Sequence, residues 1–124
     1  MKKNKTLESN SKIRKSLVKD LPQIIEIQEA VTKSKVGPKR KAILKEHIQK
    51  EGDISLVALV NGKVTGYVIG EVMTDSFGID QGGWIENSVV HPKHMGGGIG
   101  QTLTIHLFED YKERKILEIY TAVR

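Results

Sequence analysis

Cysteine is absent from the 124-residue chain, and aromatic side chains make up only 5% of it. Without cysteine there are no disulfide bonds, no thiolate metal sites and no cysteine nucleophile. No apolar run approaches the roughly 18 residues that a membrane span needs, and the lysine-rich start is followed by polar residues instead of the apolar core of a signal peptide. We therefore expect a cytoplasmic protein with no membrane partner.

Positive charge is only moderately in excess. Lysine and arginine number 20 against 15 aspartates and glutamates, which gives a formal net charge of +5. The excess lies in residues 2–19 and 33–45, and neither stretch contains an aromatic residue. Nucleic-acid binding favours basic residues interleaved with aromatic ones, on which bases stack. We therefore predict no nucleic-acid partner and interpret most of these lysines as solvated surface.

The hydrophobic content of 38% is enough for one buried core and, at this length, for no second one. Residues 1–11 have no periodic apolar pattern and are predicted to be a mobile basic tail, whereas residues 12–124 are predicted to form a single domain. This domain begins with a short strand near residues 13–17. A helix follows, with Asp20 as its N-cap and Pro22 in its first turn, and ends before Gly37.

The middle of the chain predicts a second helix and a hairpin. The helix covers residues 38–50, and residues 54–60 form an apolar run rich in branched side chains, which is typical of a buried strand. Asn61-Gly62 readily adopts the positive φ angles of a two-residue turn, so residues 54–60 and 64–72 should pair antiparallel. A loop over residues 73–83, a strand over 84–90, a helix over 101–113 and a last strand over 116–123 complete the prediction.

Four glycines in residues 96–100 connect a predicted strand to a predicted helix. Glycines allow backbone N–H groups to converge on one point, and the helix start adds unpaired donors with a partial positive charge, which favours a diphosphate ligand. The segment is not a Walker loop, because Gly100 is followed by Gln101-Thr102 where that loop has Lys and Ser or Thr. It is not a dinucleotide fingerprint either, because Leu103 stands where a third small residue is needed.

This region resembles the GNAT superfamily of N-acetyltransferases, whose glycine loop follows the pattern Val-x-Pro-x-x-Arg/Gln-x-x-Gly-x-Gly/Ala. Val90-His91-Pro92 and Gly98-Ile99-Gly100 match it. The resemblance covers residues 13–124, including the family order of strand, two helices, hairpin, strand, glycine loop, helix and strand. It implies an α/β (α+β) fold, with a mixed, mainly antiparallel sheet flanked by helices. It also implies acetyl transfer from acetyl-CoA to a primary amine by direct attack, without a metal.

The resemblance implies specific site residues as well. The diphosphate of the cofactor would bind at the glycine loop and its pantetheine arm along the preceding strand. Acetyl-CoA is thereby assigned to Ser88, Val89, Val90, Met95, Gly96, Gly97, Gly98, Ile99, Gly100 and Gln101. Met95 stands where the family has Arg or Gln, so we expect one side-chain contact to be missing. Glu86 is the candidate catalytic base. The acceptor is a small-molecule or peptide amine, and the cationic residues 33–45 favour an anionic metabolite or an acidic peptide.

The chain departs from the family pattern at its end. Members of the family continue past a strand ending in Val-Arg with an Asn, a helix that carries a Tyr, and two more strands. We therefore expect a C-terminally incomplete fold, assign no general acid, and consider a homo-oligomer in which another chain completes the sheet. The alternative interpretations are a non-catalytic CoA-binding or assembly module and an inactive truncated fragment.

Overall fold

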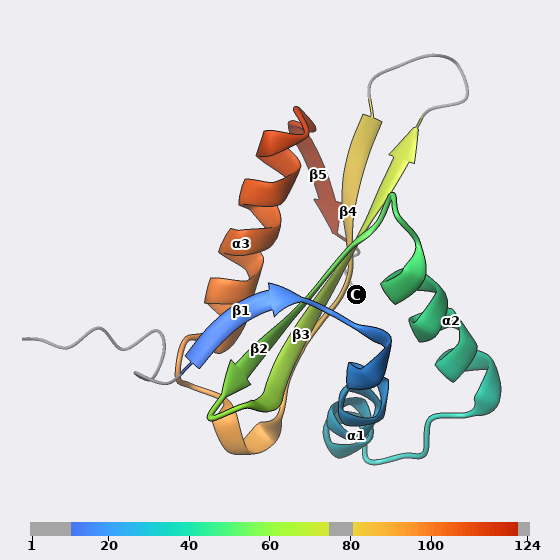
Figure 1. The fold of residues 1–124 in the computed structure, drawn as a ribbon, viewed down its shortest axis with the longest axis vertical. Helices are drawn as coiled ribbons and strands as arrows, with labels where there is room; N and C mark the ends of the chain where they lie inside the picture. The colour runs from blue at the N-terminus through green and yellow to red at the C-terminus, as the bar shows by residue number, and fades with distance from the viewer. Residues whose placement is uncertain (1–10, 75–80, 122–124) are drawn as a thin grey trace, which may run out of the picture.

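A single mixed sheet runs through the computed structural model of the protein, which describes residues 11–74 and 81–121 (Figure 1). Its strands lie in chain order: β1 (Ser11–Lys15), β2 (Ile54–Val60), β3 (Lys63–Thr74), β4 (Gln81–Val90) and β5 (Glu118–Thr121). Neighbouring strands pair antiparallel, except that β4 and β5 are parallel. The helices are α1 (Leu21–Thr32), α2 (Pro38–Gln49) and α3 (Ile99–Glu113). The predicted fold class, a mixed and mainly antiparallel sheet flanked by helices, is confirmed.

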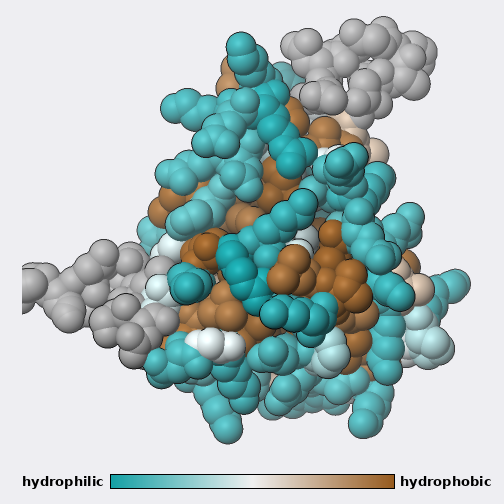
Figure 2. Space-filling view, viewed as in Figure 1, coloured by the Kyte–Doolittle hydropathy of each residue, from teal (hydrophilic) through white to brown (hydrophobic). Residues whose placement is uncertain are grey.

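The helices cover both faces of the sheet, with α3 on one face and α1 and α2 on the other (Figure 1). Leu56 and Ala58 of β2 pack in the core under α3, whereas Val57 and Leu59 pack in the core under α1 and α2. A strand buried on both faces needs no polar alternation, which explains why β2 is apolar except at Ser55. On the face drawn in Figure 2, hydrophobic residues gather near the middle and hydrophilic residues lie around them. None of the described helices is long and apolar enough to cross a membrane.

The hairpin between β2 and β3 turns at the two residues that predicted it. Asn61 and Gly62 have φ angles of 53° and 81°, both in the left-handed region that a two-residue primed turn requires. Val60 pairs with Lys63 across this turn. The predicted antiparallel hairpin is therefore confirmed.

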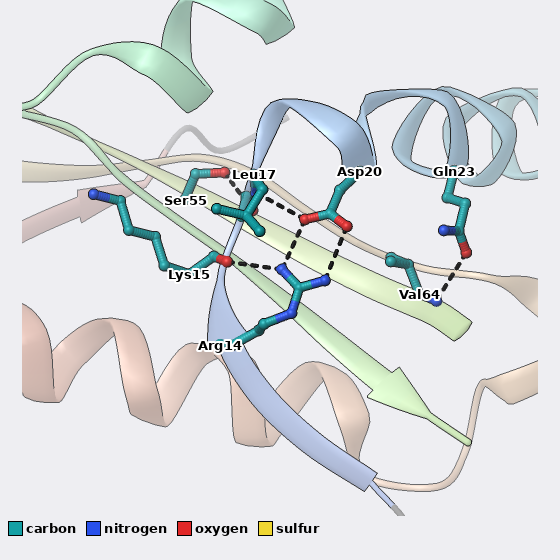
Figure 3. Close-up of polar contacts among 8 residues, drawn as sticks. Arg14, Lys15, Leu17, Asp20, Gln23, Ser55 and Val64 are labelled. Carbon is teal, nitrogen blue, oxygen red and sulfur yellow. Dashed lines mark hydrogen bonds and ion pairs between the residues drawn. The ribbon is translucent and has the colours of Figure 1, made fainter. Parts of the chain in front are cut away.

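The connection from β1 to α1 is held by an ion pair (Figure 3). The guanidinium of Arg14 donates two hydrogen bonds to the carboxylate of Asp20, at 2.8 and 3.0 Å. The same carboxylate accepts the Leu17 N–H at 2.7 Å, and the Asp20 side chain is only 3% exposed. Asp20 does precede the first residue of α1, as predicted, but its side chain makes no capping hydrogen bond to the helix. The prediction of its position is right and that of its bonding is wrong, because Arg14 and Leu17 occupy its oxygens.

Several predicted boundaries differ from those in the structure, and the larger differences concern a loop and two strands. The loop predicted over residues 73–83 is wrong at both ends, since pairing of β3 with β4 continues to Thr74 and Gln81, while residues 75–80 lie outside the described residues. β1 begins at Ser11, inside the predicted tail, whose other residues are not described. The last strand covers only Glu118–Thr121, because Ile116 is buried in the core under α3 before the strand begins, and residues 122–124 are not described.

Candidate functional site

The connection from β4 to α3 is a short 3-10 turn, Pro92–His94, followed by the glycine turn (residues 96–100). Gly96 and Gly98 have φ angles of +88° and +85°, which side chains other than glycine's rarely allow. Gly98 is also the residue that immediately precedes α3. These two glycines therefore allow the chain to pass from the end of β4 directly into the first turn of α3.

Backbone donors in this turn are left without acceptors. Among the described residues, none accepts a hydrogen bond from the N–H groups of residues 96–101. The first N–H with a helical acceptor is that of Thr102, which donates to the Gly98 carbonyl at 3.0 Å, and no side chain caps the N-terminus of α3. Successive free N–H groups at the positive end of a 15-residue helix are the groups that bind phosphate oxygens.

The last residues of β4 have a strand neighbour on one side only, as far as the described residues show. β5 pairs with residues 82–85 of β4, whereas residues 87–90 pair with β3 and with no other described strand. The His91 N–H donates to the Thr65 carbonyl at 2.8 Å and so holds the end of β4 against β3. The other edge of β4, at Ser88, Val89 and Val90, thus presents main-chain groups next to the glycine turn.

A β-bulge lies at Glu86. The residues on either side of it, Ile85 and Asn87, pair with successive residues of β3, so Glu86 has no partner in the register. In a regular strand Ile85 and Val89 would face the same side, but Ile85 packs in the core under α3 and Val89 in the core under α1 and α2. The extra residue accounts for this change of face. Glu86 and Asn87, although adjacent in the chain, therefore both face α1 and α2.

A groove of about 520 Å³ lies where these two side chains meet the helices. α1 contributes Gln28, Val31 and Thr32 to its walls, α2 contributes Arg40, and β4 contributes the two bulge residues and Val89. The groove thus combines a carboxylate, a guanidinium, neutral polar groups and two valines. It is large enough for a small organic molecule.

Tyr67 of β3 is fully buried, and its hydroxyl donates to Oε1 of Gln28 at 3.2 Å. Burial raises the pKa of Tyr67 to about 12, although the positive charge of Arg40 acts in the opposite direction. Tyr67 is therefore neutral at physiological pH and helps to hold Gln28 at the groove.

The predicted site residues lie in two places joined by the end of β4. Glu86 lines the groove, and Ser88, Val89 and Val90 lead from it to the glycine turn. Within the turn and the start of α3, Gly96, Gly97, Gly98, Gly100 and the exposed Gln101 supply free N–H groups. The N–H of Ile99 is also free while its side chain is buried, whereas the N–H of Met95 donates to the Pro92 carbonyl at 3.4 Å, and its side chain is 58% exposed.

The sequence did not identify four residues of the groove: Gln28, Val31, Thr32 and Asn87. It included Arg40 only as one cation of residues 33–45. Gln28 and Arg40 come from helices far from β4 in the chain, and no local pattern relates them to it. Asn87 follows Glu86 and would face the opposite side of a regular strand, so only the bulge places it in the groove.

Comparisons with known proteins agree with this architecture. Residues 21–124 match the family model described as the acetyltransferase (GNAT) family. No curated protein sequence matches the chain significantly.

Solved structures with the same fold include an aminoglycoside acetyltransferase from an uncultured soil metagenomic sample, in complex with trehalose. Its TM-score is 0.80 at 22% identity, and the match covers 94% of this chain and 80% of that one. A ribosomal-protein-alanine N-acetyltransferase from Brucella melitensis gives a TM-score of 0.72 at 19% identity, and the match covers 92% of this chain and 80% of that one. A GNAT family acetyltransferase from Staphylococcus aureus gives a TM-score of 0.76 at 15% identity, and the match covers 93% of this chain and 87% of that one. At these identities the likeness concerns the fold alone.

Proposed function

The chain belongs to the GNAT family of acetyltransferases, and from this premise we propose that it transfers an acetyl group from acetyl-CoA to a primary amine. The observation that carries the proposal is the run of free N–H groups over residues 96–101, placed next to an open edge of β4 and a groove that contains a carboxylate. The free N–H groups are complementary to a diphosphate, the edge of β4 to an arm that bears amides, and the carboxylate of the groove to an amine.

The glycine turn fits the diphosphate of the cofactor. Six consecutive N–H groups, those of residues 96–101, remain free, and the helix behind them adds a partial positive charge. These donors belong to the main chain, so binding does not depend on the Arg or Gln that Met95 replaces. Ser88, Val89 and Val90 would hold the pantetheine arm by main-chain hydrogen bonds, in the way that a peptide adds to a sheet edge.

Glu86 is the proposed base, because it lines the groove directly before residues 87–90 of β4, beside which no described strand lies on the β5 side. In the transfer the ammonium form of the acceptor gives one proton to Glu86, and its nitrogen then forms a bond to the thioester carbonyl carbon. The C–S bond breaks, and the second proton lost by the nitrogen is gained by the departing sulfur. A main-chain amide near Ser88 or Val89 would donate a hydrogen bond to the thioester oxygen as negative charge develops there. This chain's own residues thus orient the reactants and accept one proton, without a covalent intermediate on the enzyme.

The importance of Glu86 depends on the acceptor. An alkyl amine with a pKa near 10.4 is protonated at pH 7, and removing its proton costs ~4.6 kcal/mol, whereas an α-amine with a pKa near 7.8 costs only ~1 kcal/mol. A general base typically contributes 10² to 10⁴-fold to the rate, about 3–5 kcal/mol. Glu86 is therefore expected to matter most for alkyl amines near neutral pH and progressively less as the pH approaches the pKa of the amine.

The proposal is tested by two measurements on the same preparation. Calorimetry measures binding of CoA and acetyl-CoA, and release of the free thiol measures acetyl transfer across a panel of primary amines between pH 7 and 10. We expect Glu86→Gln to bind acetyl-CoA as the wild type does, and to lose at least 100-fold in turnover of alkyl amines at pH 7 but much less at pH 10. Glu109→Gln is the matched control, since Glu109 is an exposed residue of α3, on the opposite face of the sheet.

Two results would contradict the proposal in different ways. Cofactor binding without turnover of any amine would favour the non-catalytic CoA-binding or assembly module. No heat with CoA or acetyl-CoA at millimolar concentration would refute the cofactor site itself. The predicted cytoplasmic location and the predicted homo-oligomer stay predictions from the sequence.

A further inference from the structure

One positive and one negative side chain line the groove without neutralising each other. Arg40 extends from α2 and Glu86 from the bulge of β4. Among the described residues, neither side chain has a partner in an ion pair or a side-chain hydrogen bond. Arg14, in contrast, is engaged by Asp20 through two hydrogen bonds. Arg40 and Glu86 therefore retain their full capacity to bind charged groups of a ligand.

The rest of the groove is neutral. Val31 and Val89 are apolar, and the remaining described wall residues are uncharged amides and a hydroxyl. Oε1 of Gln28 already accepts the Tyr67 hydroxyl, and the hydroxyl of Thr32 donates to the Gln28 carbonyl at 3.0 Å. The electrostatic character of the described walls is consequently that of a dipole, positive at Arg40 and negative at Glu86.

The geometry of α2 selects Arg40 from a cluster of three cations. Lys39, Arg40 and Lys41 are consecutive, but successive residues of a helix lie about 100° apart around its axis. Arg40 is half-buried and lines the groove, whereas the two lysines are exposed and do not. The general attraction for anions expected from residues 33–45 is therefore narrowed to one guanidinium.

We propose that the acceptor amine also carries an anionic group, a carboxylate or a phosphate, which Arg40 binds while the amine lies at Glu86. This inference rests on the acetyl transfer proposed above. A guanidinium presents a planar pair of N–H donors that matches either anion through two parallel hydrogen bonds. Anchoring the anion fixes the far end of the acceptor, so that the amine is held beside the base instead of diffusing in the groove. Arg40 acts here as a specificity-determining residue that does not touch the reacting atoms.

The test compares acceptors that differ only in the anionic group. Amines with one to five methylenes between the nitrogen and a carboxylate are paired with the carboxamides of the same length, and aminoalkyl phosphates are paired with the corresponding amino alcohols. Kcat and KM are measured by thiol release for the wild type. We expect KM to be at least tenfold lower for the anionic member at the length that spans the groove. The anion that the site prefers, carboxylate or phosphate, is the one whose acceptors have the larger decrease in KM relative to their neutral partners.

Two variants assign this preference to Arg40. In Arg40→Gln we expect the KM of the anionic acceptors to rise tenfold or more, with kcat and the KM of the neutral acceptors little changed. Lys41→Gln removes the same charge from the same helix outside the groove, and should change every KM less than twofold. Circular dichroism checks that both variants are folded.

Distinct results separate failure of this inference from failure of the function on which it rests. Equal KM values for anionic and neutral acceptors in the wild type would overturn the inference and leave acetyl transfer intact. So would equal effects of Arg40→Gln and Lys41→Gln, because these would indicate general attraction in place of a binding site. Absence of turnover with every amine, charged or neutral, would instead overturn the proposed function.

Discussion

Gly83 of β4 lies under the ring of Tyr111, and this contact allows a worked prediction of stability. A Cβ atom at Gly83 would lie 2.7 Å from both Cε2 and Cζ of Tyr111, well inside van der Waals distance. The ring is fully buried, and its hydroxyl donates to the Trp84 carbonyl at 2.8 Å. Gly83 itself pairs with residues of β3 and β5 on its two sides. Neither the strand nor the ring can move away without breaking other interactions.

We expect Gly83→Ala to lower the free energy of unfolding by about 2–4 kcal/mol. Overpacking a core typically costs about 1–3 kcal/mol, and loss of the tyrosine hydrogen bond adds about 1 kcal/mol. For a domain of this size that corresponds to a fall in Tm of roughly 8–15 °C. Urea unfolding followed by the fluorescence of Trp84, the single tryptophan, measures the change directly, since this ring packs against Tyr120 at a centroid distance of 4.9 Å.

The matched control is Gly52→Ala, where a Cβ would meet nothing within 4 Å. We expect this change to alter stability by less than about 0.5 kcal/mol or to stabilise slightly through the unfolded state. A double-mutant cycle with Tyr111→Leu completes the test, because the cost of Gly83→Ala should shrink once the ring is gone. A cost that is the same in both backgrounds, or a Gly83→Ala variant as stable as the wild type, would refute the packing argument.

Three further predictions follow from other contacts. Burial alone would raise the pKa of Asp20, but hydrogen bonds from Arg14 and the Leu17 N–H outweigh it and lower this pKa. The stabilisation is thus present above the unfolded-state value near 4 and lost as the pH falls, so Asp20→Asn should cost about 2 kcal/mol in urea unfolding at pH 7 and little near pH 2. The Tyr67 pKa of about 12 predicts that the difference in tyrosinate absorbance between the wild type and Tyr67→Phe appears near pH 12. Because folding raises this pKa, the stability linked to it is present below about pH 10 and is lost as the pH rises from about 10 to about 12. An absorbance step near pH 10 would contradict the prediction. Gly98→Ala, at φ +85°, should weaken CoA binding in calorimetry about tenfold, whereas Gly97→Ala should weaken it less, and equal losses would argue against the strained turn.

Local signals were sufficient for much of the fold. Asn61 and Gly62 specify their turn through their own φ preferences, and the Gly37-Pro38 pair marks the start of α2 because proline fits the first turn of a helix. The bonding of Asp20 was beyond such signals, since a free aspartate before a helix normally caps it. Its carboxylate is instead taken by Arg14, whose position depends on the pairing of β1 with β2, a contact between distant parts of the chain.

The candidate site also has one part that local sequence signals predict, the glycine turn, and one part that they do not, the groove. The glycine turn is contiguous, and its chemistry follows from glycine and from the helix start, so the sequence was enough to locate it. The groove needs α1, α2 and β4 together, and its Arg40 belongs to a run of cations among which the sequence makes no distinction. Only the packing of α2 against the sheet decides which of them enters the groove.

The bulge at Glu86 shows why the groove end of the candidate site is difficult to predict from residue patterns. A bulge is a property of the register between two strands, and a residue that lacks a partner across the pair has no local signature of its own. Without it, Glu86 and Asn87 would face opposite sides of β4, and only one of them could reach the groove. With it, the carboxylate and the amide stand together on the face of Arg40, while the residues after them keep their open edge toward the glycine turn. One unpaired residue thus relates the proposed base, the proposed cofactor edge and the proposed acceptor groove, and the pairing of β3 with β4 sets the spacing of these three parts.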